Sequence, residues 1–197
     1  YEIHERLVGS EMCIRDSFGT FKTRDTVICG NRCEVDFENG YLVSKKIPME
    51  MDTIFDLAST SKVFTAVAVL KLEEVGLIDV FDPVKKYVPE FRKLGDTTIY
   101  DLLKFRVKVV TDKRVDSAKT SDDALNILYT LHPVEKELNE NSYTDMGAMA
   151  LRIVVERVTR MQFTSFINTA ILRMIGMKDT ASVSYTHLRA HETLMNL

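Results

Sequence analysis

Ser59 and Lys62 form an S-x-x-K pair at the start of a predicted helix. One helical turn separates them, so the Lys62 amine can lie beside the Ser59 hydroxyl. A serine hydroxyl is a weak nucleophile that needs a neighbouring base, and a lysine is such a base only when burial or positive potential lowers its pKa. We expect the helix start to lower the pKa of Lys62 and to direct backbone N–H groups at a developing oxyanion. The pair therefore predicts nucleophilic acyl-transfer chemistry.

A four-letter pattern of this kind is common, and it has a purely structural alternative. In that alternative Ser59 is the N-cap of the helix and Lys62 extends from a solvated face. The helix itself argues against this, because residues 60–74 are apolar on nearly all faces and offer Lys62 little contact with water. Such a helix is predicted to be central and buried, and Gly76 marks its end.

The remaining pattern predicts strands first and helices afterwards. Three short β-rich runs, at 26–29, 33–37 and 41–44, are separated by turn sequences around Gly30 and Gly40, which predicts an antiparallel meander. Further helices follow the helix at 60–74. They are expected over 97–103, 120–131, 144–160 and 164–175. This order is typical of the α+β class.

The two ends of the chain encode each other in DNA. Residues 12–16 can be written ATG TGT ATA AGA GAC, and the opposite strand, GTC TCT TAT ACA CAT, encodes residues 183–187. The relation continues without a break through both ends, and the DNA resembles a transposase-type sequencing-library adapter. We therefore predict that 1–17 and 183–197 are adapter-derived tails that pack little against a natural domain of residues 18–182.

The histidines and cysteines carry no convincing metal pattern. His187 and His191 stand four residues apart beside Glu192, which suits zinc ligands on one helical face, but they lie in the predicted C-terminal tail. Cys29 and Cys33 have no partner pair and are interpreted as small residues in strands. We predict neither a metal nor a cofactor.

The overall composition argues against several classes of protein. The 197 residues are 45% hydrophobic and 28% charged, with a net charge of -3 and no long basic run, so we expect no nucleic-acid partner. The most apolar stretch, 63–72, is shorter than the roughly 20 residues that span a bilayer, so no transmembrane segment is expected. Three cysteines argue against a disulfide framework and favour a reducing, cytoplasmic compartment for this segment.

Several motifs, in order along the chain, carry a resemblance to a known family. They are the segments 53–65, 72–84 and 87–91, I-Y-D-L-L at 99–103, N-S-Y-T-D-M-G at 141–147 and G-M-K-D-T at 176–180. With these motifs the chain resembles the serine β-lactamase-related family, which holds class C β-lactamases, penicillin-binding-protein-like DD-peptidases and related esterases. The resemblance runs over most of residues 18–182 and implies an α+β fragment of the β-lactamase/DD-peptidase-like fold.

The resemblance also implies roles for four residues. Ser59 would be the acylated nucleophile and Lys62 its activating base. Tyr143 would be the proton-transferring phenol, and Asp145 would hydrogen-bond Lys62 and the substrate. A phenolate beside a lysine ammonium can itself serve as a base near neutral pH. The structural alternative for Tyr143 is a half-buried aromatic residue beside a helix N-cap.

Two departures from the family pattern matter. After the helix at 99–103 the family usually has T-H-T-S-G, whereas this chain has K-F-R-V-K at 104–108, so the substrate rim is expected to differ. The family's third motif, on a C-terminal strand, is absent, which we interpret as truncation before the tail. That strand would supply an oxyanion donor, so the chain alone is expected to be inactive.

Two functions are consistent with these features. The leading interpretation is a serine hydrolase that forms an acyl-enzyme with an ester, a D-Ala peptide or a β-lactam. The alternative is a non-catalytic binding or sensor module that binds such ligands without turnover. The presence of Ser59, Lys62 and Tyr143 favours the enzyme, because a module without turnover would be free to lose any of them. The expected partner is a small-molecule or peptide acyl substrate; its identity and the oligomeric state are left open.

Overall fold

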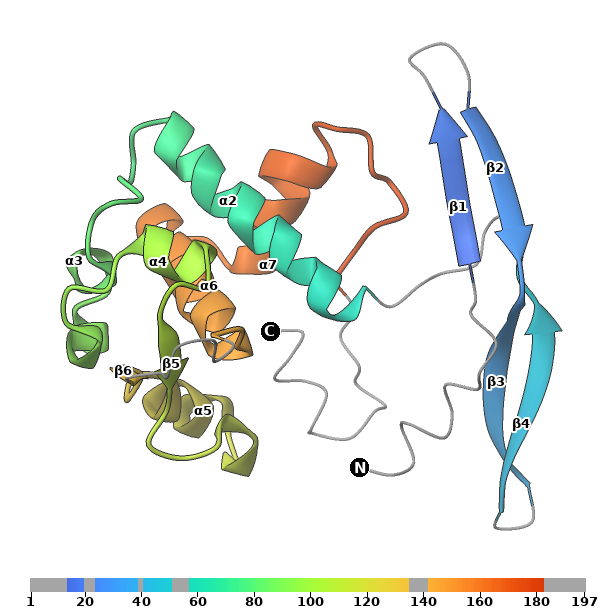
Figure 1. Ribbon diagram of the computed structural model, residues 1–197, viewed down its shortest axis with the longest axis horizontal. Helices are drawn as coiled ribbons and strands as arrows, with labels where there is room; N and C mark the ends of the chain where they lie inside the picture. The colour runs from blue at the N-terminus through green and yellow to red at the C-terminus, as the bar shows by residue number, and fades with distance from the viewer. Residues whose placement is uncertain (1–13, 20–23, 39–40, 51–56, 135–141, 183–197) are drawn as a thin grey trace. The chain divides into compact units, whose positions relative to one another are not determined.

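A computed structural model describes residues 14–19, 24–38, 41–50, 57–134 and 142–182 of the chain (Figure 1). The chain divides into two compact units, Tyr1–Asp56 and Leu57–Leu197. The described part of the first unit consists of strands, and the second is mostly helical. The strand-then-helix order confirms the predicted α+β class.

The first unit contains two antiparallel hairpins. Strand β1 (Ile14–Gly19) pairs with β2 (Arg24–Cys29), and β3 (Asn31–Glu38) pairs with β4 (Tyr41–Pro48). The predicted continuous meander is wrong, because β2 and β3 are not neighbours in either described sheet. Gly30, at φ 93°, is a bend whose carbonyl oxygen accepts the Met49 N–H at 3.1 Å, so the backbone there extends the β3–β4 ladder.

The N-terminal hairpin corrects part of the tail prediction. Ile14 lies opposite Cys29 and Ser17 opposite Thr26, so the last four residues of the predicted tail are paired with β2. Strand pairing uses backbone N–H and C=O groups that every sequence supplies, so it requires no selected side chains. The rest of the two predicted tails, 1–13 and 183–197, lies outside the described residues.

The second unit begins with a 3₁₀ turn, η1 (Ala58–Ser61), that runs directly into helix α2 (Lys62–Glu74). The predicted later helices are present, and a short antiparallel strand pair that the sequence analysis did not predict lies among them. The elements after α2 are α3 (Val84–Tyr87), η2 (Pro89–Leu94), α4 (Ile99–Leu103), β5 (Lys108–Val110), η3 (Val115–Ser117), α5 (Ser121–Leu128), β6 (His132–Val134), α6 (Asp145–Thr159), α7 (Phe163–Ile167) and the π-helical turn η4 (Asn168–Leu172).

Polar side chains define the starts of three helices. Thr98 and Asp101 form a capping box at α4, in which each side chain accepts a hydrogen bond from the other residue's backbone N–H. Thr120 and Thr144 accept backbone N–H groups at the starts of α5 and α6. These caps satisfy donors that have no partner within the helix, so the helix starts follow from local sequence.

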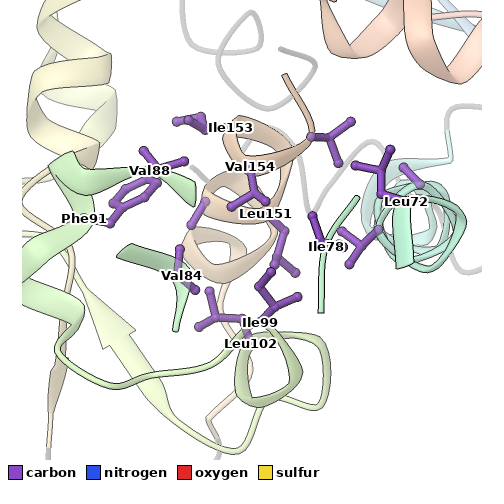
Figure 2. Close-up of a cluster of buried hydrophobic side chains, with 14 of the residues drawn as sticks. Leu72, Ile78, Val84, Val88, Phe91, Ile99, Leu102, Leu151, Ile153 and Val154 are labelled. Carbon is purple, nitrogen blue, oxygen red and sulfur yellow. The ribbon is translucent and has the colours of Figure 1, made fainter. Parts of the chain in front are cut away.

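Helix α6 is the centre of the hydrophobic core and contacts α2, α3, α4 and α7. Figure 2 shows Leu72 of α2 on one side of α6 and Phe91 of η2 on the other. The fully buried side chains of this core include Val69, Leu72, Val84, Val88, Phe91, Leu94, Ile99, Leu102, Val154 and Val155. This packing holds the starts of α2 and α6 in fixed positions.

Only one face of α2 is buried in the described structure. Thr65, Ala68, Val69 and Leu72 are buried, whereas Val63, Val67 and Leu70 are 58%, 40% and 50% exposed. The prediction that α2 is buried on nearly all faces is therefore wrong for the described part of the chain. The described helices that pack against α2 lie along one side of it, and apolar composition alone does not specify how many layers cover a helix.

Candidate active site

Ser59 lies within the 3₁₀ turn that precedes α2, and not at a helix cap. The N-cap positions of η1 and α2 are Leu57 and Ser61, so the structural alternative for Ser59 is wrong. Ala58, immediately before it, has φ 43°, a left-handed conformation that costs a non-glycine residue about 1–2 kcal/mol. Ser59 is exposed, at the positive end of the dipole of the helix that follows.

Lys62 connects the serine to the rest of the site. Its Nζ donates a hydrogen bond to Ser59 Oγ at 3.0 Å, which confirms the predicted proximity of the two groups. The same Nζ lies 2.5 Å from Asp145 Oδ1 and 5.1 Å from the centroid of the Tyr143 ring. The Lys62 side chain is only 17% exposed, so it does not extend from a solvated face.

Tyr143 and Asp145 approach the serine from the start of α6. They flank Thr144, the N-cap residue, and the packing of α6 against α2 carries both to Lys62. Tyr143 is 47% exposed, so burial alone does not fix its orientation. The structure thus brings together all four residues that the sequence analysis singled out.

The electrostatics of Lys62 differ from the sequence prediction. Burial lowers the pKa of the Lys62 ammonium, but hydrogen bonds and charges from Asp145 and Tyr143 outweigh it, and the net pKa is raised above the ordinary lysine value. The prediction that the helix start leaves Lys62 with a lowered pKa is therefore wrong. The reason is tertiary, because the carboxylate that stabilises the ammonium comes from α6.

The pKa of Tyr143 moves in the opposite direction. Hydrogen bonds with Ser59 and then Lys62, together with the positive charge of Lys62, hold the pKa of the phenol below its usual value, against smaller opposing effects of desolvation and of Asp145. An ammonium and a phenol made more acidic therefore share one serine hydroxyl. Opposite shifts of neighbouring groups are typical of sites that transfer protons.

Phe105 is a neighbour of the site that the sequence analysis did not identify. Its ring centroid lies 4.9 Å from that of Tyr143, with the ring planes at 38°. It belongs to the 104–108 segment, which differs from the family pattern, and its backbone has φ 50°. That conformation costs a non-glycine residue about 1–2 kcal/mol. The sequence signal that could have identified Phe105 is an aromatic residue just after the end of a short capped helix, where glycine is usual.

Features that would indicate other functions are few in the described residues. They contain no cluster of three or more histidine, cysteine, aspartate or glutamate side chains suited to a metal ion. Within the same residues, no helix combines the length and apolar character needed to cross a bilayer. Cys29 and Cys33 lie in β2 and β3, as predicted.

The comparison with known families identifies the class of protein. The model of the Beta-lactamase family matches residues 33–192, which is most of the chain. The chain therefore belongs to the Beta-lactamase family. The match includes 183–192, the first ten residues of the predicted C-terminal tail.

Individual relatives agree with this assignment. The chain is 26% identical over 163 residues to Protein flp of Staphylococcus aureus (strain MW2), covering 77% of this chain and 32% of that protein. It is 28% identical over 149 residues to Penicillin-binding protein 4* of Bacillus subtilis (strain 168), covering 70% of this chain and 32% of that protein. The chain thus spans about a third of the length of these curated relatives.

Solved structures of similar proteins share the fold. FmtA from Staphylococcus aureus matches with a TM-score of 0.61 and 25% identity, over 76% of this chain and 46% of that one. A penicillin-binding protein from Bacillus halodurans matches with a TM-score of 0.59 and 19% identity, over 80% of this chain and 55% of that one. The predicted β-lactamase/DD-peptidase-like fold is confirmed.

Proposed function

We propose that the chain carries the nucleophile of a serine hydrolase that works through an acyl-enzyme on Ser59. The observation that supports this most strongly is the convergence on the Ser59 hydroxyl of a cation, Lys62, and a phenol with a lowered pKa, Tyr143. A serine becomes an effective nucleophile when a neighbouring group accepts its proton and a nearby positive charge stabilises the anion that forms.

The proton path follows from the two pKa directions. Lys62, with its raised pKa, is an ammonium at neutral pH, and its charge favours the ionised form of Tyr143, which is the form that can accept the Ser59 proton. As Ser59 Oγ bonds to the acyl carbon, its proton moves to the Tyr143 oxygen. The bond from the acyl carbon to the leaving nitrogen or oxygen then breaks, and Tyr143 returns the proton to that atom.

Lys62 and Asp145 support this transfer without taking the proton. The ammonium stabilises the phenolate and, through its 3.0 Å hydrogen bond, the developing charge on Ser59 Oγ. The Asp145 carboxylate, 2.5 Å from the ammonium, holds Lys62 charged and orients it. In the second half of the reaction, water attacks the acyl carbon and gives its proton to Tyr143. The bond from that carbon to Ser59 Oγ then breaks, and Tyr143 returns the proton to the serine oxygen.

The proposed substrate is an ester, a D-Ala peptide or a β-lactam. All three present a carbonyl carbon that a serine can attack and a leaving group that must be protonated. The name of one relative, Penicillin-binding protein 4*, supports a penicillin-like ligand among these candidates. The second candidate is a module that binds such ligands without turnover, and the exposure of Ser59 suits ligand binding as well.

Covalent labelling tests the proposal. The chain is incubated with a fluorophosphonate, which phosphonylates activated serines, and with a fluorescent penicillin, and the modified peptide is identified by mass spectrometry. We expect one adduct, on Ser59, that is lost in Ser59→Ala and strongly slowed in Lys62→Ala and Tyr143→Phe. Hydrolysis of nitrocefin and p-nitrophenyl acetate is measured in parallel, and little turnover is expected from this chain alone.

Ser61→Ala is the matched control, because Ser61 lies on the same exposed turn and its side chain makes no capping hydrogen bond. Its labelling should equal that of the unmodified chain. A folded chain that carries no adduct with either probe, or one whose labelling falls as much in Ser61→Ala as in Ser59→Ala, would contradict the proposal. Reversible penicillin binding without an adduct would support the second candidate.

A further inference from the structure

The turn that ends α4 contains a residue whose type does not suit its backbone. Lys104 is the C-cap of α4, and the two residues after it close the helix with two hydrogen bonds: Phe105 N–H donates to Leu102 O at 3.2 Å, and Arg106 N–H donates to Asp101 O at 2.9 Å. This is the Schellman motif, in which the residue after the C-cap adopts a left-handed conformation and is usually glycine. Here that residue is Phe105, at φ 50°.

The geometry of this turn therefore does not account for a phenylalanine at position 105. Glycine would adopt the same backbone without strain, because it has no Cβ to meet the following carbonyl oxygen. A phenylalanine at this position makes the turn less stable than glycine would, unless contacts of its ring offset the difference. Backbone strain of this kind, observed next to a candidate site, points to a use for the side chain.

Among the residues that the structure describes, the ring of Phe105 pairs with the aromatic ring of Tyr143. The two centroids are 4.9 Å apart with the planes at 38°, within the range of favourable aromatic pairs. Tyr143 is 47% exposed, so burial alone does not fix its ring. Phe105 and the Lys62 ammonium, 5.1 Å from the Tyr143 centroid, both lie against that ring and restrain it.

We propose that Phe105 is a positioning residue that holds the Tyr143 ring toward Ser59 and Lys62, an inference that rests on the acyl-transfer function proposed above. Phe105 does not touch the reacting atoms. It acts through Tyr143, whose hydroxyl must stay within hydrogen-bond reach of Ser59 to move a proton. The left-handed backbone is what directs the Phe105 side chain from the end of α4 to this position.

The test separates the ring from the turn by using four variants of the full chain. Phe105→Gly keeps the Schellman backbone and removes the ring, Phe105→Ala removes the ring and keeps the strain, and Phe105→Tyr keeps the ring. Phe81→Ala is the control for loss of an aromatic pair, because Phe81 is 68% exposed and contacts Tyr100 at 5.3 Å between centroids. Folding of each variant is checked by circular dichroism.

Two measurements are made on each variant. The titration of Tyr143 is followed by NMR of chains labelled at the tyrosine Cζ, with Tyr143→Phe to assign the signal, and the rate of Ser59 phosphonylation is followed with the fluorophosphonate. We expect the Tyr143 pKa to rise toward its ordinary value in Phe105→Gly and Phe105→Ala, because the hydrogen bonds with Ser59 and Lys62 are made less often. The labelling rate should fall on the order of 10-fold in both.

Phe105→Tyr, which keeps the ring, and Phe81→Ala, which lies outside the site, should both stay within about twofold of the parent rate. An unchanged Tyr143 titration and labelling rate in folded Phe105→Gly would overturn the inference, even if Ser59 labelling itself were intact. Conversely, a Tyr143 titration that responds to Phe105 in a chain that labels nowhere would support the positioning role and contradict the proposed function. The two failures are therefore distinguishable.

Discussion

Removal of the Asp145 carboxylate should destabilise the chain more than removal of the lysine that it contacts. The reason is the unequal exposure of the two partners, 17% for the Lys62 side chain and 41% for Asp145. Asp145→Ala leaves a largely buried ammonium without its carboxylate, whereas Lys62→Met leaves a carboxylate that water can reach. Unpaired buried charges are costly, and hydrated ones are not.

The size of the expected destabilisation follows from the partial burial of the Lys62–Asp145 ion pair, which lies between the fully exposed and the fully buried case. A fully exposed ion pair contributes about 0.2–1 kcal/mol, and loss of one partner from a fully buried pair costs about 3–5 kcal/mol. We therefore expect Asp145→Ala to lower the free energy of unfolding by about 2 kcal/mol, and Lys62→Met to lower it by less than about 0.5 kcal/mol. In the double variant most of the cost of Asp145→Ala should disappear.

Urea unfolding at pH 7, followed by far-ultraviolet circular dichroism, measures all of these free energies. Asp122→Ala is the matched control, because Asp122 also lies in the first turn of a helix and its loss reports the helix-dipole contribution, about 0.5 kcal/mol. If Asp145→Ala costs no more than Asp122→Ala, or if Lys62→Met is the more costly change, the argument from exposure is refuted.

Two further predictions concern the core and the pH dependence. Leu102→Ala should lower the free energy of unfolding, measured by urea unfolding, by about 2–5 kcal/mol, because Leu102 of α4 is 1% exposed and packs against α6. Tyr143 has a lowered pKa, so ionisation of its phenol stabilises the folded chain. This stabilisation is complete at pH values above the ordinary pKa of 10.0 and is lost as the pH falls through the pKa of the folded chain. The loss of stability in Tyr143→Phe, measured by urea unfolding at a series of pH values, should therefore grow as pH rises toward 10; a difference independent of pH would contradict the assignment.

The sequence by itself determined the features that depend on a few neighbouring residues. The capping box of Thr98 and Asp101 and the N-cap Thr144 fix where α4 and α6 begin, because their hydrogen bonds close within one turn. The contact of Ser59 with Lys62 is equally local, since any helical turn brings residues three apart together. The α+β class followed from the order of these local patterns.

Tertiary structure decided what those residues can do. Lys62 was expected to lose its proton easily, but α6 supplies Asp145, and the pKa of the lysine rises. The exposed face of α2 and the contact of Phe105 with Tyr143 could likewise not be predicted from the sequence, since both depend on which elements pack against each other. Hydrogen bonds within one turn are set by sequence spacing, whereas burial and charge interactions depend on distance in space, which only the packed chain defines.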